Sequence, residues 1–153
     1  MRQSGFTLVE LIVVMMIVGI LAVAAIPRFF QQQTFEARGY HDQVLAMVRY
    51  AQKAAIAQRT SVFVNADGGS DTVCLTYVSD PGCTNVVNVV INPADQSRFS
   101  RPAPDGVTLD GSDAFSFSAL GRPEPNAAVV IGIVGDGITR TITVERETGY
   151  VHP

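Results

Sequence analysis

The sequence is poor in the residues from which enzyme active sites and metal centres are usually built. It has two histidines, His41 and His152, and no motif brings either of them together with a nucleophile and an orienting acid. We therefore expect no catalytic residue, no metal-binding residue and no cofactor, and the chain is predicted not to be an enzyme. His41 falls in a helical pattern, where we expect a solvated position.

Cysteine is equally scarce, and its two copies, Cys74 and Cys83, lie in a stretch rich in turn residues. Without further Cys or His residues at metal-ligand spacing, they do not form a zinc site. A disulfide is the favoured interpretation, and it indicates an oxidising compartment such as the periplasm. It would stabilise the fold by roughly 2–3 kcal/mol. Two free thiols are the alternative.

Positive charge is in short supply in the C-terminal part. From Thr60 onward there are five basic and eleven acidic residues, whereas residues 28–59 have five basic and two acidic ones. An acidic surface repels a phosphate backbone, which argues against nucleic acid as a partner. Arg98 and Arg101 flank Phe99, a faint base-stacking pattern that this acidic excess outweighs. With 47% hydrophobic and 16% charged residues, the chain is not a disordered protein.

What the sequence does have is one long apolar run, residues 6–26. Except for Thr7 and Glu10, every residue in it is apolar or glycine. As a helix rising about 1.5 Å per residue, the run spans roughly 31 Å, the thickness of a bilayer's hydrocarbon core. This predicts a single transmembrane helix. A cleaved secretory signal peptide is the alternative, but the run is long for one, and only one basic residue, Arg2, precedes it.

Glu10 is the anomaly in this run. A carboxylate within lipid costs at least a few kcal/mol and should have a partner, and no basic residue lies in the run. A cut between Gly5 and Phe6 would create an α-amino group close to Glu10, in the same chain or in a stacked neighbour. Pairing with that amine would remove the uncompensated charge. The alternative is a glutamate that sits at the interface and reaches water.

The segment Gly5-Phe6-Thr7-Leu8-Val9-Glu10, after a short leader and before an apolar helix, closely resembles the processing signal of type IV pilins and type II secretion pseudopilins. The resemblance implies that prepilin peptidase cuts after Gly5 and methylates Phe6, and that Glu10 guides assembly. It also implies the other partners: pilin or pseudopilin subunits and an inner-membrane assembly platform. The chain would be a single-pass protein of the bacterial inner membrane, with its head in the periplasm until assembly.

Beyond Pro27, which is expected to end or kink the apolar helix, an apolar stripe at three-and-four spacing predicts a spine helix up to about Gln58. From Thr60 the period changes to two. The predicted strands cover residues 61–65, 72–78, 86–92, 106–110, 114–118, 128–134, 138–145 and 150–152. Gly135-Asp136-Gly137 is a strong hairpin signal.

These patterns predict an α+β pilin fold, a long kinked N-terminal helix followed by an antiparallel β-sandwich head. The expected parts are a leader (residues 1–5), a transmembrane and assembly helix (6–26), an amphipathic spine helix (27–59) and a β-rich periplasmic head (60–153).

Residues 115–122 and the closing Thr148-Gly149-Tyr150-Val151 resemble the GspH/FimT (MshC-like) group of minor pilins. That resemblance implies a structural subunit with an initiation or tip role in a type IV pilus or type II secretion pseudopilus. A tip subunit that binds DNA for uptake is the alternative. Tyr150 stands where this group often has a basic residue, a departure that speaks against DNA binding.

Overall fold

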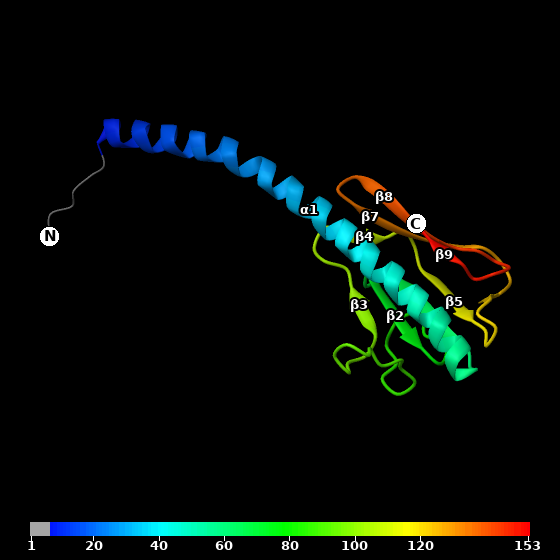
Figure 1. The fold of residues 1–153 in the computed structure, drawn as a ribbon. Helices are drawn as coiled ribbons and strands as arrows, with labels where there is room; N and C mark the ends of the chain where they lie inside the picture. The colour runs from blue at the N-terminus through cyan, green and yellow to red at the C-terminus, as the bar shows by residue number, and fades with distance from the viewer. Residues whose placement is uncertain (1–6) are drawn as a thin grey trace. The chain divides into compact units, whose positions relative to one another are not determined.

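The computed structural model describes residues 7–153, except for the side chains of residues 23–33. It begins with one helix, α1 (Leu8–Gln58), which ends where the sequence predicted and continues across Pro27. The chain divides into two compact units, Met1–Gln32 and Gln33–Pro153. The second unit, here called the head, contains the rest of α1 and all the strands (Figure 1).

The head has two antiparallel sheets. The five-stranded sheet has the order β3-β2-β1-β5-β6, and the four-stranded sheet has the order β4-β7-β8-β9. The strands are β1 (Val62–Asp67), β2 (Thr72–Thr76), β3 (Ser100–Pro102), β4 (Val107–Leu109), β5 (Asp113–Phe117), β6 (Pro123–Glu124), β7 (Val129–Gly135), β8 (Ile138–Val144) and β9 (Val151–His152). The expected combination of a helix with antiparallel strands is thus confirmed.

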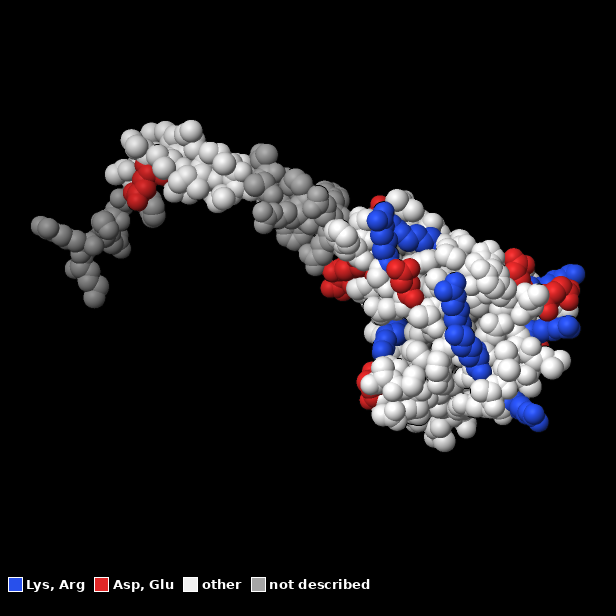
Figure 2. All heavy atoms as spheres, in the orientation of Figure 1, with Lys and Arg blue, Asp and Glu red and all other residues white. Residues whose placement is uncertain are grey.

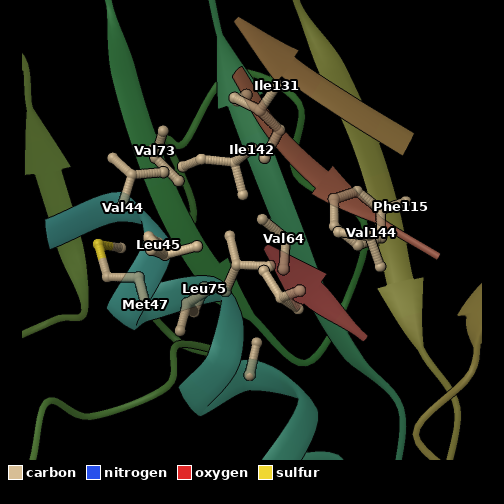
Figure 3. Close-up of a cluster of buried hydrophobic side chains, with 14 of the residues drawn as sticks. Val44, Leu45, Met47, Val64, Val73, Leu75, Phe115, Ile131, Ile142 and Val144 are labelled. Atoms are coloured by element: carbon tan, nitrogen blue, oxygen red, sulfur yellow. The ribbon is translucent and has the colours of Figure 1, made fainter. Parts of the chain in front are cut away.

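The apolar stripe of α1 closes the core of the head. Val44, Met47 and Val48 are at most 2% exposed and face residues of both sheets. Figure 3 shows these layers meeting: helical side chains lie next to those of the five-stranded sheet, with those of the four-stranded sheet behind. The labelled sheet residues are Val64, Val73, Leu75, Phe115, Ile131, Ile142 and Val144. Burying this apolar area is the main force that holds α1 to the strands.

The predicted hairpin is confirmed. Strands β7 and β8 pair from Val129↔Val144 to Gly135↔Ile138, leaving Asp136-Gly137 as a two-residue turn. Both turn residues have positive φ, 55° at Asp136 and 77° at Gly137, as this tight connection requires.

The strand predicted for residues 86–92 is wrong. Only isolated bridges occur there, at Val89 and Ile91, and Val86 and Val87 are 68% and 81% exposed. The Asn85 side chain accepts the Val87 and Asn88 amides, which turns the backbone away from a sheet. Two short strands, β3 and β6, were not predicted; each contains a proline, which usually argues against a strand.

Candidate assembly site

The start of α1 is capped by Thr7. Its hydroxyl accepts the Glu10 amide at 3.3 Å, and its carbonyl accepts the Leu11 amide at 3.2 Å. The spacing Thr-x-x-Glu is that of a capping box, in which the cap satisfies a free amide of the first turn. Glu10 therefore lies in the first turn, where the helix dipole favours a carboxylate. Gly5 and Phe6, the predicted cleavage and methylation residues, lie outside the described residues.

The apolar side chains after this cap are not packed against other described residues. Residues 7–22 are exposed on every side of the helix; Leu8 is 74% and Val14, one of the least exposed, 47% exposed. The part of the chain that the structure describes has no helical stretch that is both long and apolar enough to cross a membrane. It also holds no basic side chain paired with Glu10. A helix that is apolar on all sides needs lipid or other protein around it.

The second half of α1 binds the four-stranded sheet through polar side chains as well as the core. His41 Nε2 lies 3.2 Å from the Thr141 carbonyl oxygen of β8. Arg49 donates from Nε and Nη2 to the Val151 carbonyl oxygen of β9, at 3.2 and 3.0 Å. At 100° per residue these two side chains lie within about 80° of each other around the helix, on the side that faces the sheet edge.

His41 was therefore wrongly predicted to be solvated, since it is only 8% exposed. Its other ring nitrogen, Nδ1, lies 3.2 Å from Asp42 Oδ1. Because the Thr141 carbonyl is an acceptor only, Nε2 must carry a proton for this contact to be a hydrogen bond. His41 is thus a structural link between α1 and β8.

Gln52 extends these links toward the end of α1. Its Nε2 donates to the Gly121 carbonyl oxygen at 3.0 Å and to the Thr148 carbonyl oxygen at 3.1 Å. Gly149 closes this contact with φ +66°, and a Cβ there would lie 1.9 Å from the Gly121 oxygen. The predicted closing motif therefore forms a tight backbone junction in which only glycine fits at position 149.

The other end of the same sheet is fixed to the helix by the hairpin. Gly135 packs on Ala37 so closely that a Cβ there would come within 2.6 Å of the Ala37 side chain. At the turn, Asp136 and Arg140 form two parallel hydrogen bonds of 3.0 Å. The Arg140 guanidinium holds the pKa of Asp136 below its usual value, and the Thr34 side chain adds to the effect.

Tyr40 fixes the five-stranded sheet to α1 in a similar way. Its hydroxyl donates to the Arg101 and Asp71 carbonyl oxygens, at 3.1 and 3.3 Å. Burial raises the pKa of Tyr40, as does the charge of Asp71, so the phenol stays protonated and keeps its donor.

The predicted disulfide is present. Cys74 and Cys83 are bonded, with their Cα atoms 5.8 Å apart. Beside the bond, the Asp80 carboxylate accepts the Thr84 and Asn85 amides at 3.1 and 2.8 Å. Together the bond and the carboxylate fix the start of the loop between β2 and β3.

The weak base-stacking pattern around Phe99 is occupied by contacts within the head. Phe99 packs on Tyr50, with ring centroids 5.2 Å apart, so its ring is already part of a stack within the head. Arg98 donates to the Cys83 carbonyl oxygen, and Arg101 lies 3.7 Å from Asp95. Near the start of β2, the Asp67 carboxylate accepts hydrogen bonds from Ser70 Oγ and the Gly69 amide, which lower the pKa of Asp67, the Ser70 bond most. No group of potential metal ligands occurs among the described residues.

Comparison with known proteins identifies the family. The prokaryotic N-terminal methylation motif matches residues 1–26. The type IV narrow pilus major component PilA5 of Thermus thermophilus is 38% identical over 116 residues, which cover 72% of this chain and 100% of PilA5. The chain belongs to the type IV pilin family. The type IV major pilin PilA of Myxococcus xanthus is 31% identical, over 94% of this pilin and 66% of its own length.

Two solved structures share the fold of this pilin. The type IV minor pilin FimU of Pseudomonas aeruginosa superposes with a TM-score of 0.55 at 14% identity, covering 78% of this chain and 90% of FimU. The minor pseudopilin EpsH of the Vibrio cholerae type 2 secretion system gives 0.57 at 14% identity, covering 76% and 94%. The α+β pilin fold is thus confirmed.

Proposed function

We propose that this pilin is processed between Gly5 and Phe6 by prepilin peptidase, methylated on Phe6, and assembled with other pilin subunits by an inner-membrane platform. Before assembly, residues 6–26 anchor it in the bacterial inner membrane, and the spine (27–59) and strands (60–153) lie in the periplasm. Its role is structural, and we propose no enzymatic activity for it. The methylation motif over residues 1–26 and the family's solved folds support this proposal.

One observation carries the proposal: residues 7–22 are apolar and exposed on all sides, yet begin with a capped turn that holds Glu10. A surface of this kind is stable in lipid, and later in a filament core made of identical helices. When the helix moves from lipid into the filament, the new amine on Phe6 neutralises the Glu10 of a neighbouring subunit. This pairing selects one position of the two helices along the filament axis. A wrong register would leave a buried charge unpaired, at a cost of a few kcal/mol.

The test is the variant Glu10→Gln, which keeps the shape of the side chain and removes its charge. We expect normal membrane insertion and processing, and about tenfold less chain in sheared filaments, as the loss of a pair worth roughly 1.4 kcal/mol requires. Glu147→Gln, a matched change in an exposed residue of the head, is the control. Filament incorporation of Glu10→Gln at the control level would refute the role of Glu10.

Processing is tested separately by Gly5→Ala. We expect the chain to keep its leader and to lack the methyl group on Phe6, as measured by mass spectrometry of the membrane fraction. A wild-type mass for this variant, or a wild-type chain that still begins with Met1, would refute cleavage after Gly5.

An initiation or tip position is the second candidate role. The specific observation in its favour is the fold shared with FimU and EpsH, both described as minor subunits; the GspH/FimT grouping is proposed on the same ground. The sequence relatives PilA5 and PilA are described as major subunits. Quantitative mass spectrometry of purified filaments counts the copies of this chain per filament. A few copies would indicate a tip subunit, and many copies would indicate a major subunit.

The DNA-binding tip subunit is the remaining alternative. Its cheapest test is the retention of labelled DNA by purified filaments at low salt and again at 0.2 M salt. Because Phe99 is stacked on Tyr50 and Arg101 lies beside Asp95, we expect no retention that survives the higher salt.

A further inference from the structure

The outward face of α1 carries a shallow groove within the head. Two adjoining depressions of about 480 Å³ each share Ala46 and Tyr50. The first is lined only by α1, and the second continues onto the loop at Pro93 and Phe99. The lining of the first is Asp42, Leu45, Ala46, Arg49, Tyr50 and Lys53. Ala46, which lines both depressions, has a small side chain that leaves room between its larger neighbours.

This groove has an excess of positive charge. Lys53 has no acidic partner within residues 34–153, and Arg49 is bound only to the Val151 carbonyl. Asp42, the one acid in the lining, offsets one of these charges, so that Arg49 and Lys53 leave the first depression with one net positive charge. Figure 2 shows Lys and Arg side chains spread over the visible face of the head, some of them where α1 faces the viewer in Figure 1, with Asp and Glu side chains between them. A ligand for this groove should therefore be acidic.

The head also carries an acidic turn, whose negative charge is complementary to the positive charge of the groove. Asp110 and Asp113 are exposed, and neither forms an ion pair within the described part of the head. The turn between them is held in place: the Gly68 amide donates to Ser112 Oγ at 2.9 Å, and a Cβ on Gly68 would come within 2.6 Å of the Gly111 oxygen. A fixed turn loses little entropy on binding.

We propose that the groove of one copy receives the Asp110–Asp113 turn of a second copy in the assembled filament. The contact joins two different surfaces, so it is heterologous: it leaves a free groove at one end of a pair and a free turn at the other. Repetition of such a contact gives an open helical filament and not a closed dimer. The inference rests on the proposed function, to which it adds the partner and the residues that join the heads.

Charge reversal tests this pairing in the full-length chain in cells. Lys53→Glu gives the groove the charge of the turn, and Asp113→Lys does the opposite. Because like charges placed together repel each other, we expect each single variant to lower the yield of sheared filaments by about tenfold or more. The double variant should recover to within about twofold of wild type, as should co-expression of the two single variants.

The matched control is Glu124→Lys, which reverses another exposed acid without an ion pair among the described residues, on β6 and away from the turn. It should assemble like wild type, and all variants should show the wild-type mature mass. Neutral single reversals, or a double variant worse than either single one, would overturn the pairing with a second copy and leave the filament function standing. A wild-type chain absent from filaments would overturn both.

Discussion

The two halves of α1 are stabilised in different ways. In residues 7–22 every side chain is exposed, although nearly all are apolar. From Thr34 to Gln58 most apolar positions are buried, Phe35 and Ile56 being exceptions. The polar residues His41, Arg49 and Gln52 bond carbonyls of the strands and of the loops between them. The second half is thus complete within one chain, whereas the first half lacks the apolar surroundings that its sequence requires. The head is thus folded by contacts within its own chain, whereas the N-terminal half of α1 needs lipid or other subunits around it.

Matched methionine substitutions should separate the two halves most sharply. Met47 is 2% exposed and Met16 is 64% exposed. Met47→Ala should lower the free energy of unfolding of the head by about 2–5 kcal/mol, because it removes buried methylenes and leaves a cavity. Met16→Ala should change it by less than about 0.5 kcal/mol. Urea unfolding of the full chain in detergent, followed by tyrosine fluorescence, measures this, since all four tyrosines lie in the head. Equal losses would show that the halves fold as one unit.

The same contrast explains what the sequence could predict. The apolar run, the spine helix and the β7–β8 hairpin come from periodic patterns and turn residues, which act over a few positions. The bond from His41 to Thr141 joins residues 100 positions apart, and no local pattern tells which strand edge needs a donor. The Thr7 cap, in contrast, is local, because the spacing Thr-x-x-Glu is typical of a helix start.

The false strand at residues 86–92 has a similar cause. Its apolar residues fit a strand, but Asn85 forms a side-chain turn that leaves Val86 and Val87 exposed, and only the residues after it bond the backbone next to β2. The roles of Gly5, Phe6 and Glu10 stay predictions, because they depend on a peptidase and on neighbouring subunits. The head's structure therefore follows from this chain alone, and the function of its N-terminal segment does not.

Removing the disulfide tests whether the loop beside it can lose stability while the N-terminal segment is unaffected. Cys74→Ala with Cys83→Ala should lower the free energy of unfolding by roughly 2–3 kcal/mol, because the unfolded chain gains freedom. Hydrogen exchange should rise at the amides of Thr84 and Asn85, which Asp80 holds beside the bond. Exchange in residues 7–22 should not change. If it did, the N-terminal segment would depend on contacts with the head.

A smaller loss of stability, confined to the N-terminal segment and not to the head, is expected from Thr7→Ala. Loss of the cap should cost about 1 kcal/mol of local helix stability and leave urea unfolding of the head unchanged. The measurement is hydrogen exchange at the Glu10 and Leu11 amides in detergent micelles, where both should exchange faster. Thr7→Ser, which keeps the hydroxyl, should behave like wild type. If the serine variant also exchanged faster, the Thr7 methyl group and not its hydroxyl would be responsible.

The smallest effect should come from pH and should be confined to the head. The Glu145 carboxylate, 3.1 Å from His152 Nε2, raises the pKa of His152 above 6.5, and the Pro153 carbonyl adds to this. Because the folded pKa is the higher one, the stabilisation is fully present below pH 6.5 and is lost as pH rises through the folded pKa. The urea midpoint of wild type minus that of His152→Gln should therefore be positive at pH 5.5 and fall toward zero by pH 8. If the difference between the two urea midpoints stayed constant over that range, Glu145 and His152 would not be coupled in solution. Residues 7–22 contain no histidine, so the stability of that segment should not show this pH dependence.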